Sequence, residues 1–257
     1  MTNKSILCIV EGEVTEIEIL EQIKEYYIER DIKFIPFRTN IYHVYNTYIK
    51  KRKKYGSEID MFIFLKEFFD KENVIGDKKK NDFLGIYLFM DLEYHEPLAR
   101  TYQNCIIDML NIFNDPNENG LLYISYPMVE AFHHSYFPHE IYHFNKLGEL
   151  KEYKKFVKDY LCINKINLQE ISRENIDKIM TNNIKQMNFL ISNIFCYPEN
   201  YNIDQWSQIY IFEKLSAFIN ENKIIILSSF PFFLLEYLGE KLFLQWKNCD
   251  TEINSKP

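Results

Sequence analysis

The chain has 257 residues, 47% of them hydrophobic, with 8 prolines and 7 glycines, so it can bury a sizeable core and lacks the composition of a disordered protein. The net charge of −7 argues against nonspecific coating of nucleic acid, because that affinity depends on lysine and arginine neutralising phosphates. A site built from carboxylates and divalent cations is still compatible with this charge. The five cysteines are scattered without a CxxC pair, which indicates reduced thiols rather than a thiolate zinc site.

No apolar stretch approaches the roughly 18 to 20 residues that a membrane span requires. The first residues, MTNKSILCIVEGE, also lack the long apolar core of a signal peptide. We therefore expect a cytoplasmic protein without a membrane partner.

The first 38 residues have the pattern of a β-α-β unit. Residues 5–10 (SILCIV) form a continuous apolar run, typical of a strand buried on both faces. Thr15 and Glu18 have the spacing of a capping box, and the apolar residues that follow recur at helical spacing. Residues 31–38 (DIKFIPFR) are predicted to be the second strand.

Three later segments are also predicted to be strands, because each is a short apolar run between polar residues. They are residues 83–90 (FLGIYLFM), 121–125 (LLYIS) and 223–227 (KIIIL). After the second of these, Pro127 suits the first turn of a helix, and Glu130 would lie within that turn.

Helical periodicity dominates residues 140–222, in which no convincing strand is recognisable. Residues 57–71 are predicted to be an amphipathic helix, and they follow the basic run at residues 50–54 (KKRKK). The Ser-Ser pair before Pro231 lies where a helix N-cap is expected, and Pro231 would open that helix. The tail after Trp246 is expected to fray.

Together these patterns predict an α/β fold with a mostly parallel, Rossmann-like sheet flanked by helices. Residues 1–139 would form the α/β core, and residues 140–222 a helical insertion or subdomain. Residues 223–257 would supply a strand and a helix that return to the core.

Acidic residues follow three of the predicted strands: Glu11, then Asp91 with Glu93, and then Glu130. Ligands of parallel α/β sheets bind beyond the carboxyl ends of the strands, so these carboxylates would converge if the strands are neighbours. Closely packed carboxylates repel one another unless a cation compensates their charge. Hard oxygen ligands suit Mg²⁺ or Mn²⁺, so we expect these four residues to form a metal site.

Two of these motifs resemble the Toprim domain, whose signature is a Glu-Gly turn followed by Asp-x-Asp at a later strand end. Residues 9–12 (IVEG) match the turn, and residues 91–93 (DLE) match the second motif except for its last acid. The longer forms EGEVTE and YPMVEAF resemble more specifically the RloB-like and OLD-nuclease-related Toprim proteins of bacterial anti-phage systems. The resemblance covers about the first 130 residues, together with the last predicted strand.

This resemblance implies a Toprim-like fold and a Mg²⁺- or Mn²⁺-dependent nuclease that hydrolyses DNA or RNA, with transfer RNA among the candidates. Glu11, Asp91 and Glu93 would be catalytic residues and metal ligands, and Glu130 a further ligand. Because Glu93 replaces an aspartate, its extra methylene shifts the carboxylate and changes the metal position or weakens one metal site.

An alternative function is a non-catalytic Toprim-like module that binds and regulates a partner such as an ATPase. The chain contains no P-loop (GxxxxGK[ST]), so an ATP-driven step would have to come from that partner. Either function is compatible with a homodimer.

Gly12, Glu13 and His95 are supporting candidates around these acids. Gly12 stands where another group is expected to approach the backbone closely. Glu13 and Glu16 are better explained as charges at a helix start, as Glu11 would be if it stood alone. His95 could assist proton transfer or bind phosphate, although a loop histidine usually has neither role.

Other charged or metal-binding residue types have ordinary explanations. The histidines of residues 133–143 (HHSYFPHEIYH) fit no standard zinc motif, although one of them could act near the carboxylates. The basic run at residues 50–54 could contact phosphates but is typical of a solvated surface. Lys78–Lys80 would lie at the opposite end of the strand from Asp91, and we expect them to be solvated.

Overall fold

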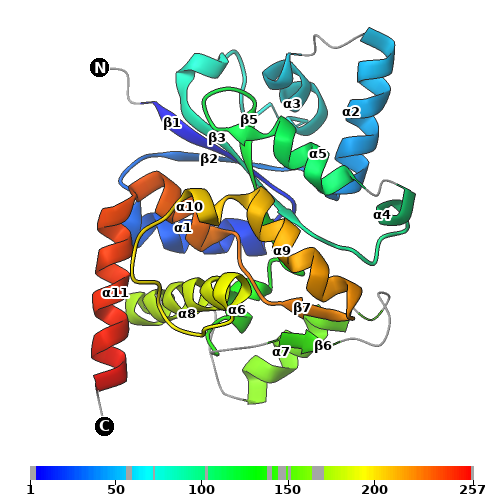
Figure 1. The fold of residues 1–257 in the computed structure, drawn as a ribbon. Coiled ribbons are helices and arrows are strands. Elements are labelled where there is room, and N and C mark those ends of the chain that lie inside the picture. Colours follow the sequence, from blue (N-terminus) through cyan, green and yellow to red (C-terminus); the bar gives the residue numbers. More distant parts are fainter. Residues whose placement is uncertain are drawn as a thin grey trace. The chain divides into compact units, whose positions relative to one another are not determined.

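The computed structural model describes residues 4–55, 60–71, 73–101, 104–137, 141–143, 149, 152–163 and 171–255 (Figure 1). The chain divides into two compact units. The first comprises residues 1–91 and 96–123, and the second comprises residues 92–95 and 124–257.

The first unit is built on a five-stranded sheet with the order β2-β1-β3-β5-β4. The interior strand β1 (Ser5–Val10) is parallel to both β2 (Ile32–Pro36) and β3 (Phe83–Asp91). At one edge, β4 (Asn114–Asp115) pairs antiparallel with β5 (Gly120–Ser125). The prediction of an α/β fold with a mostly parallel sheet is therefore confirmed.

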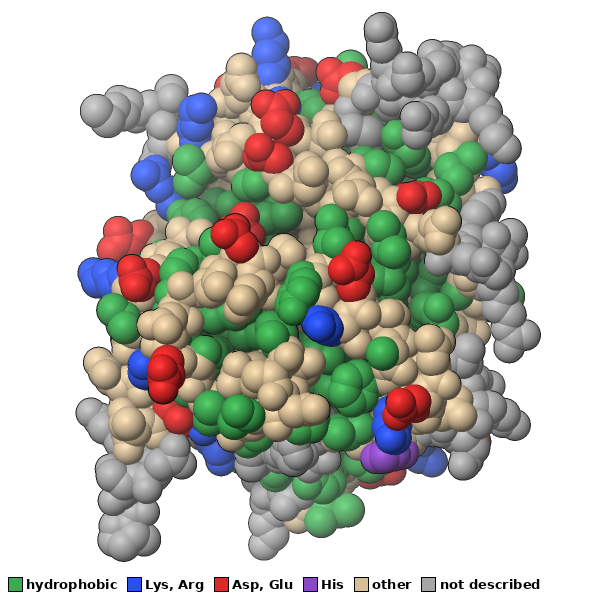
Figure 2. All heavy atoms as spheres, in the orientation of Figure 1, with side chains coloured by type: hydrophobic (Ala, Val, Ile, Leu, Met, Phe, Trp, Pro, Cys, Tyr) green, Lys and Arg blue, Asp and Glu red, His purple; other side chains and the backbone are tan. Residues whose placement is uncertain are grey.

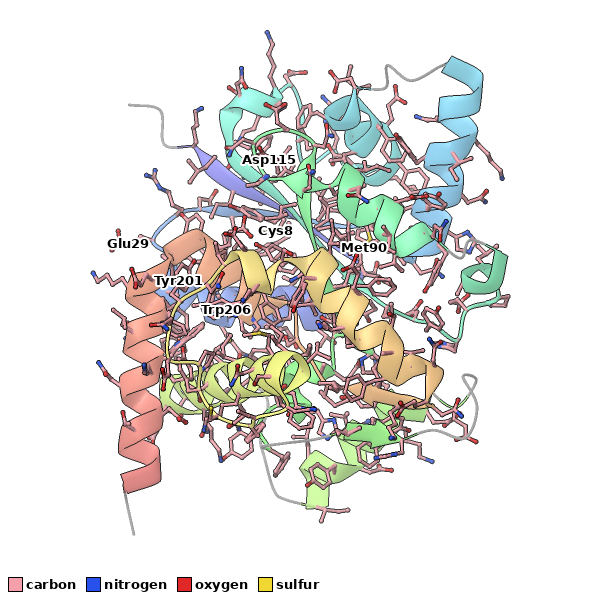
Figure 3. All side chains as sticks on the ribbon, in the orientation of Figure 1. Cys8, Glu29, Met90, Asp115, Tyr201 and Trp206 are labelled. Atoms are coloured by element: carbon pink, nitrogen blue, oxygen red, sulfur yellow. The ribbon has the colours of Figure 1, made fainter. Side chains whose placement is uncertain are left out.

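All six residues of β1 are buried, which is why this strand is a continuous apolar run in the sequence. Figure 3 shows the side chains of Cys8 on β1 and Met90 on β3, both of which are buried. Burial raises the pKa of the Cys8 thiol far above its usual range. The thiol is therefore an inert part of the core.

Among its described residues, the first unit also contains five helices and one 3₁₀ turn, and α1 (Thr15–Tyr27) joins β1 to β2 as the predicted β-α-β unit requires. Tyr45 on α2 (Ile41–Tyr55) donates a hydrogen bond to the carboxylate of Asp108 on α5 (Cys105–Ile112). The elements are α1 (Thr15–Tyr27), α2 (Ile41–Tyr55), α3 (Met61–Phe69), the turn Lys80–Asp82, α4 (Pro97–Thr101) and α5 (Cys105–Ile112).

Two predicted helix starts differ from those in the structure, and part of the basic run is not described. The capping box of Thr15 and Glu18 is not formed: Thr15 is already helical, and Val14 holds the N-cap position without a side-chain acceptor. The helix predicted from residue 57 begins at Met61, with Asp60 as N-cap, and residues 56–59 lie outside the described part. Of the basic run, the side chains of residues 52–54 also lie outside it.

The second unit is predominantly helical, as the periodicity of residues 140–222 predicts, but it also contains a short strand in that region. This strand, β6 (Ile141–His143), is too short to show alternation and pairs antiparallel with β7 (Lys223–Ile225), so the expectation of no strand there was wrong. The elements are α6 (Ala131–His134), β6 (Ile141–His143), α7 (Tyr153–Ile163), α8 (Arg173–Ser192), the turn Asp204–Trp206, α9 (Gln208–Asn220), β7 (Lys223–Ile225), α10 (Phe230–Leu238) and α11 (Glu240–Ser255).

The chain after β5 does not form a helix at Pro127 as expected. Tyr126 exchanges two backbone hydrogen bonds with Leu227, at 2.8 and 3.0 Å, and this pairing keeps the chain extended. The helix α6 begins only at Ala131, with Glu130 at its N-cap position. The strand β7 belongs to the two-stranded sheet with β6, and the bridge between Tyr126 and Leu227 lies two residues after the end of β7.

The C-terminal helix is ordered well beyond Trp246, so the expectation of a frayed tail was wrong. After a break at Gly239, whose φ is +71°, α11 continues to Ser255. The buried indole of Trp246 donates to the Asp177 carboxylate at 2.9 Å, and Asp250 forms an ion pair with Lys185 of α8. These two contacts with α8 stabilise residues 246–250 of α11.

Two adjacent histidines of α6 are buried inside the second unit. Burial lowers the pKa of both His133 and His134 to about 4. His134 Nδ1 lies 2.7 Å from the hydroxyl of Tyr153, and its ring contacts those of Phe156 and Tyr160. Of the two other histidines in this tract, the one at position 139 lies outside the described residues, and His143 is exposed at the end of β6.

None of the helices in the described ranges has both the length and the apolarity needed to cross a membrane.

We predict that acid destabilises the protein partly through His134. Its pKa falls from 6.5 to about 4 on folding, so the unfolded chain binds the proton first as the pH falls. The free energy of unfolding should therefore decrease between about pH 6.5 and pH 4, by at most on the order of 3 kcal/mol for this group. Urea titrations at several pH values should show a shallower decrease for His134→Gln than for the unaltered protein. Identical pH slopes would contradict this assignment.

Candidate functional site at the carboxyl ends of β1 and β3

Glu11 follows β1 directly, and backbone hydrogen bonds fix it at the carboxyl end of this interior strand. Its N–H donates to the carbonyl oxygen of Phe89 on β3 at 3.2 Å, and its carbonyl oxygen accepts from the N–H of Arg38 at 3.0 Å. Neighbouring segments on both sides of β1 therefore determine where Glu11 lies.

The side chain of Glu11 reaches the end of the neighbouring strand. Its Oε2 accepts a hydrogen bond from the backbone N–H of Asp91, the last residue of β3, at 2.9 Å. Both residues are partly exposed to solvent. The structure thus brings together two acids that are 80 positions apart in the chain, at the strand ends where the sequence places them.

The turn after Glu11 is held by Glu16, which the sequence interpretation treated only as a helix-start charge. Glu16 is buried, and its Oε1 accepts from the N–H of Gly12 at 2.9 Å. A Cβ at position 12 would lie 2.3 Å from Oε2 of Glu16. The group that approaches the backbone at Gly12 is therefore this carboxylate.

Glu13 forms an ion pair with Arg38, in which both side chains are more than half exposed. Arg38 lies two residues after β2 and has a φ of +54°, the left-handed conformation that non-glycine residues seldom adopt. The sequence interpretation missed this arginine because it considered only acids at strand ends. The same positional rule, applied to cations, would have selected it.

Glu93 and His95 belong to the second unit, where they are partly exposed. The N–H of Glu93 donates to the carbonyl oxygen of Pro127 at 3.3 Å, and the N–H of Leu92 donates to Ser125 at 3.1 Å. Glu93 also has a left-handed backbone, with a φ of +39°. The segment after β3 is therefore held by the segment that follows β5.

Glu130 is almost completely buried in the second unit, and its carboxylate lies 3.0 Å from Nζ of Lys154. This ion pair within the unit gives the buried charge a counter-ion. Glu130 therefore has a structural partner in addition to its predicted role as a ligand.

The described residues contain no group of three or more His, Cys, Asp or Glu side chains arranged to hold a metal ion. A magnesium site does not require such a group, because Mg²⁺ is commonly held by one or two carboxylates, with waters and substrate phosphate oxygens as its other ligands. Glu11 and Asp91 are two residues with hard oxygen atoms at adjacent strand ends, and they are the ones that would hold such an ion. The chemistry of this pair fits Mg²⁺ or Mn²⁺.

On the face drawn in Figure 2, the coloured acidic and basic side chains are interspersed rather than gathered by sign. A polyanionic ligand on this face would therefore have to be recognised by a few particular cationic groups or by a bound metal ion.

Comparison of the chain with protein-family models, with curated proteins and with solved structures gave no match. The assignment of a function therefore rests on the residues and their geometry.

We predict that Gly12 and Glu16 are energetically coupled. Gly12→Ala should lower the free energy of unfolding by about 1 kcal/mol, because the new Cβ displaces the Glu16 carboxylate from the Gly12 N–H. In a Glu16→Ala background the same substitution should be neutral or slightly stabilising, since the steric conflict is gone and alanine restricts the unfolded chain. Urea denaturation of the four proteins measures the coupling. Additive effects would show that the carboxylate is not what requires a glycine.

Proposed function

We propose that this chain is a Mg²⁺- or Mn²⁺-dependent nuclease of Toprim type, which hydrolyses phosphodiester bonds of DNA or RNA in bacterial anti-phage defence. The observation that supports this proposal is the hydrogen bond between the Glu11 carboxylate and the N–H of Asp91. It joins the carboxyl ends of two adjacent parallel strands. Parallel α/β sheets bind their ligands beyond these strand ends.

Glu11 and Asp91 are the residues that would hold the cation. The Asp91 N–H orients the Glu11 carboxylate before any ligand binds, so less ordering is needed when the site is loaded. A bound Mg²⁺ ion supplies Lewis-acid polarisation of a phosphoryl oxygen and lowers the pKa of a coordinated water.

Glu93 is proposed as the third acidic residue of the catalytic site, at the position where the Toprim motif has its second aspartate. Its left-handed backbone costs on the order of 1 kcal/mol or more for a non-glycine residue. Strain of this kind is concentrated at functional sites, which supports a role for this position. Glu130 is not included in the proposed catalytic set, because its carboxylate is engaged by Lys154.

We predict that the neutral variants Glu11→Gln and Asp91→Asn lose cleavage by about 100-fold or more, because each removes an anionic ligand while preserving shape. The assay is incubation with labelled DNA and with total RNA, in the presence of Mg²⁺, Mn²⁺ or EDTA. Glu21→Gln is the matched control, since Glu21 is exposed on α1 and its loss changes the net charge equally. Cleavage by Glu11→Gln at the rate of this control would contradict the proposal.

We further predict that titration with Mn²⁺ gives a binding heat for the unaltered protein and for Glu21→Gln. Glu11→Gln and Asp91→Asn should each give a much smaller heat or none, because each removes one of the two anionic ligands that the adjacent strand ends provide. Isothermal titration calorimetry separates metal binding from catalysis. Equal heats in all four proteins would show that Mn²⁺ binds at another site. This result would contradict the proposed nuclease site at Glu11 and Asp91.

A further inference from the structure

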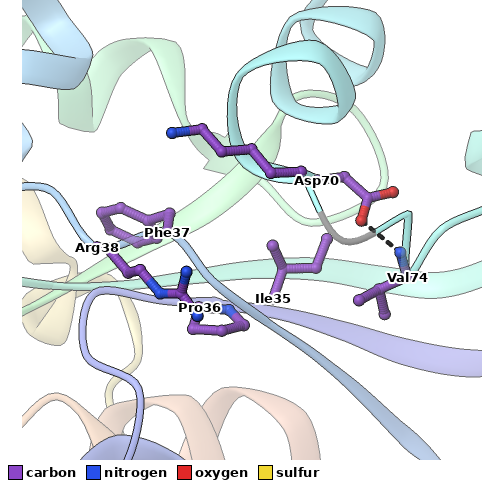
Figure 4. A pocket seen from close by; sticks show the side chains of 7 residues that line it. Ile35, Pro36, Phe37, Arg38, Asp70 and Val74 are labelled. Atoms are coloured by element: carbon purple, nitrogen blue, oxygen red, sulfur yellow. Dashed lines mark hydrogen bonds between the residues drawn. The ribbon is translucent and has the colours of Figure 1, made fainter.

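A small pocket lies in the first unit beside the carboxyl end of β2 (Figure 4). Residues 35–38 form one side of it, and Asp70, Lys71 and Val74, which follow α3, form the other. Its volume is about 40 Å³, several times the roughly 10–15 Å³ that one ordered water requires. The pocket can therefore admit a group of several heavy atoms.

The charged lining of this pocket is suited to an anion. Asp70 is its one acid among these residues, and both carboxylate oxygens accept backbone hydrogen bonds, from Val74 at 2.5 Å and from Ile75 at 2.8 Å. Figure 4 shows the Asp70–Val74 bond as a dashed line. The carboxylate is thus engaged by its own loop, whereas Arg38 and Lys71 supply cationic groups.

The arginine of the pocket is linked directly to the proposed site. The N–H of Arg38 donates to the carbonyl oxygen of Glu11 at 3.0 Å, so the two residues are neighbours across the sheet edge. Its left-handed backbone, with a φ of +54°, is strained for a side chain other than glycine. The fold therefore holds a cation beside Glu11 at an energetic cost.

The ion pair of Arg38 with Glu13 does not prevent this cation from binding another anion. The two side chains are 58% and 52% exposed, and ion pairs this exposed contribute little free energy. A phosphate group can accept two hydrogen bonds from the planar guanidinium and replaces such a partner at little cost.

We propose that this pocket binds a backbone phosphate of a nucleic-acid strand, through Arg38 and Lys71, beside the phosphodiester held at Glu11 and Asp91. This inference rests on the proposed function, because it assigns the pocket to the same substrate. Glu13 occupies the guanidinium of Arg38 when the strand is absent.

The test is the fluorescence anisotropy of a fluorescein-labelled, single-stranded 12-nucleotide DNA, titrated with protein in EDTA so that neither metal nor cleavage contributes. Arg38→Gln and Lys71→Gln should each weaken binding about fivefold to tenfold, and each should reduce the slope of log K against log salt by about 0.7. Lys4→Gln is the matched control. Lys4 is exposed and immediately precedes β1, at the end of that strand opposite Glu11.

The variant Glu13→Gln is expected to bind the DNA strand more tightly than the unaltered protein. Removing the competing carboxylate should strengthen strand binding about twofold to threefold, which loss of folding could not imitate. No binding by the unaltered protein, or equal affinities of Arg38→Gln and Lys4→Gln, would overturn the proposal. Displacement of the strand by adenosine monophosphate at the same phosphate concentration would overturn the assignment to a strand.

The same measurements separate this inference from the nuclease proposal. If Arg38→Gln weakens binding but no cleavage occurs with Mg²⁺ or Mn²⁺, the phosphate pocket is supported and the nuclease proposal fails. If cleavage depends on Glu11 but Arg38→Gln binds like the control, the nuclease proposal is supported and the pocket fails.

Discussion

The candidate site depends on the parallel pairing of β1 with β3. This pairing places Val10 opposite Phe89, so that the next residues of the two strands emerge at one edge and the Glu11 carboxylate can reach the Asp91 N–H. Six consecutive buried residues fix the register of β1, because a slip would disrupt their packing on both faces of the sheet. Apolar burial thus brings the acidic residues Glu11 and Asp91 together although their like charges repel one another.

Much of this framework could be predicted from local patterns alone. The apolar runs of β1 and β3 are long enough to identify each strand, and the acids at their carboxyl ends mark where Glu11 and Asp91 meet. These two predictions succeed because burial of nearly every residue leaves a continuous apolar signal in the sequence, whereas β2 is only partly buried. The α/β class and the β-α-β start follow from the same signal.

Two kinds of detail could not be predicted. At the turn, local contacts compete: the spacing suggests a cap by Thr15, but the helix already starts at that residue, and Glu16 bonds to Gly12 instead. Other details depend on contacts between distant segments. Arg38 follows a strand end and could be selected on that ground, but its proximity to Glu11 arises only when β2 pairs with β1. The strand β6 is three residues long, too short for a periodic pattern, and its pairing with β7 is visible only in three dimensions.

Both tryptophans of the chain, Trp206 and Trp246, are buried in the second unit. Their emission therefore reports on that unit, whereas the far-ultraviolet circular dichroism signal arises from the helices of both units. A difference between the denaturation midpoints seen by the two signals would show that the units unfold separately, and coincident midpoints are what a single cooperative transition gives. The positions of two indoles thus provide an intrinsic optical probe of folding cooperativity.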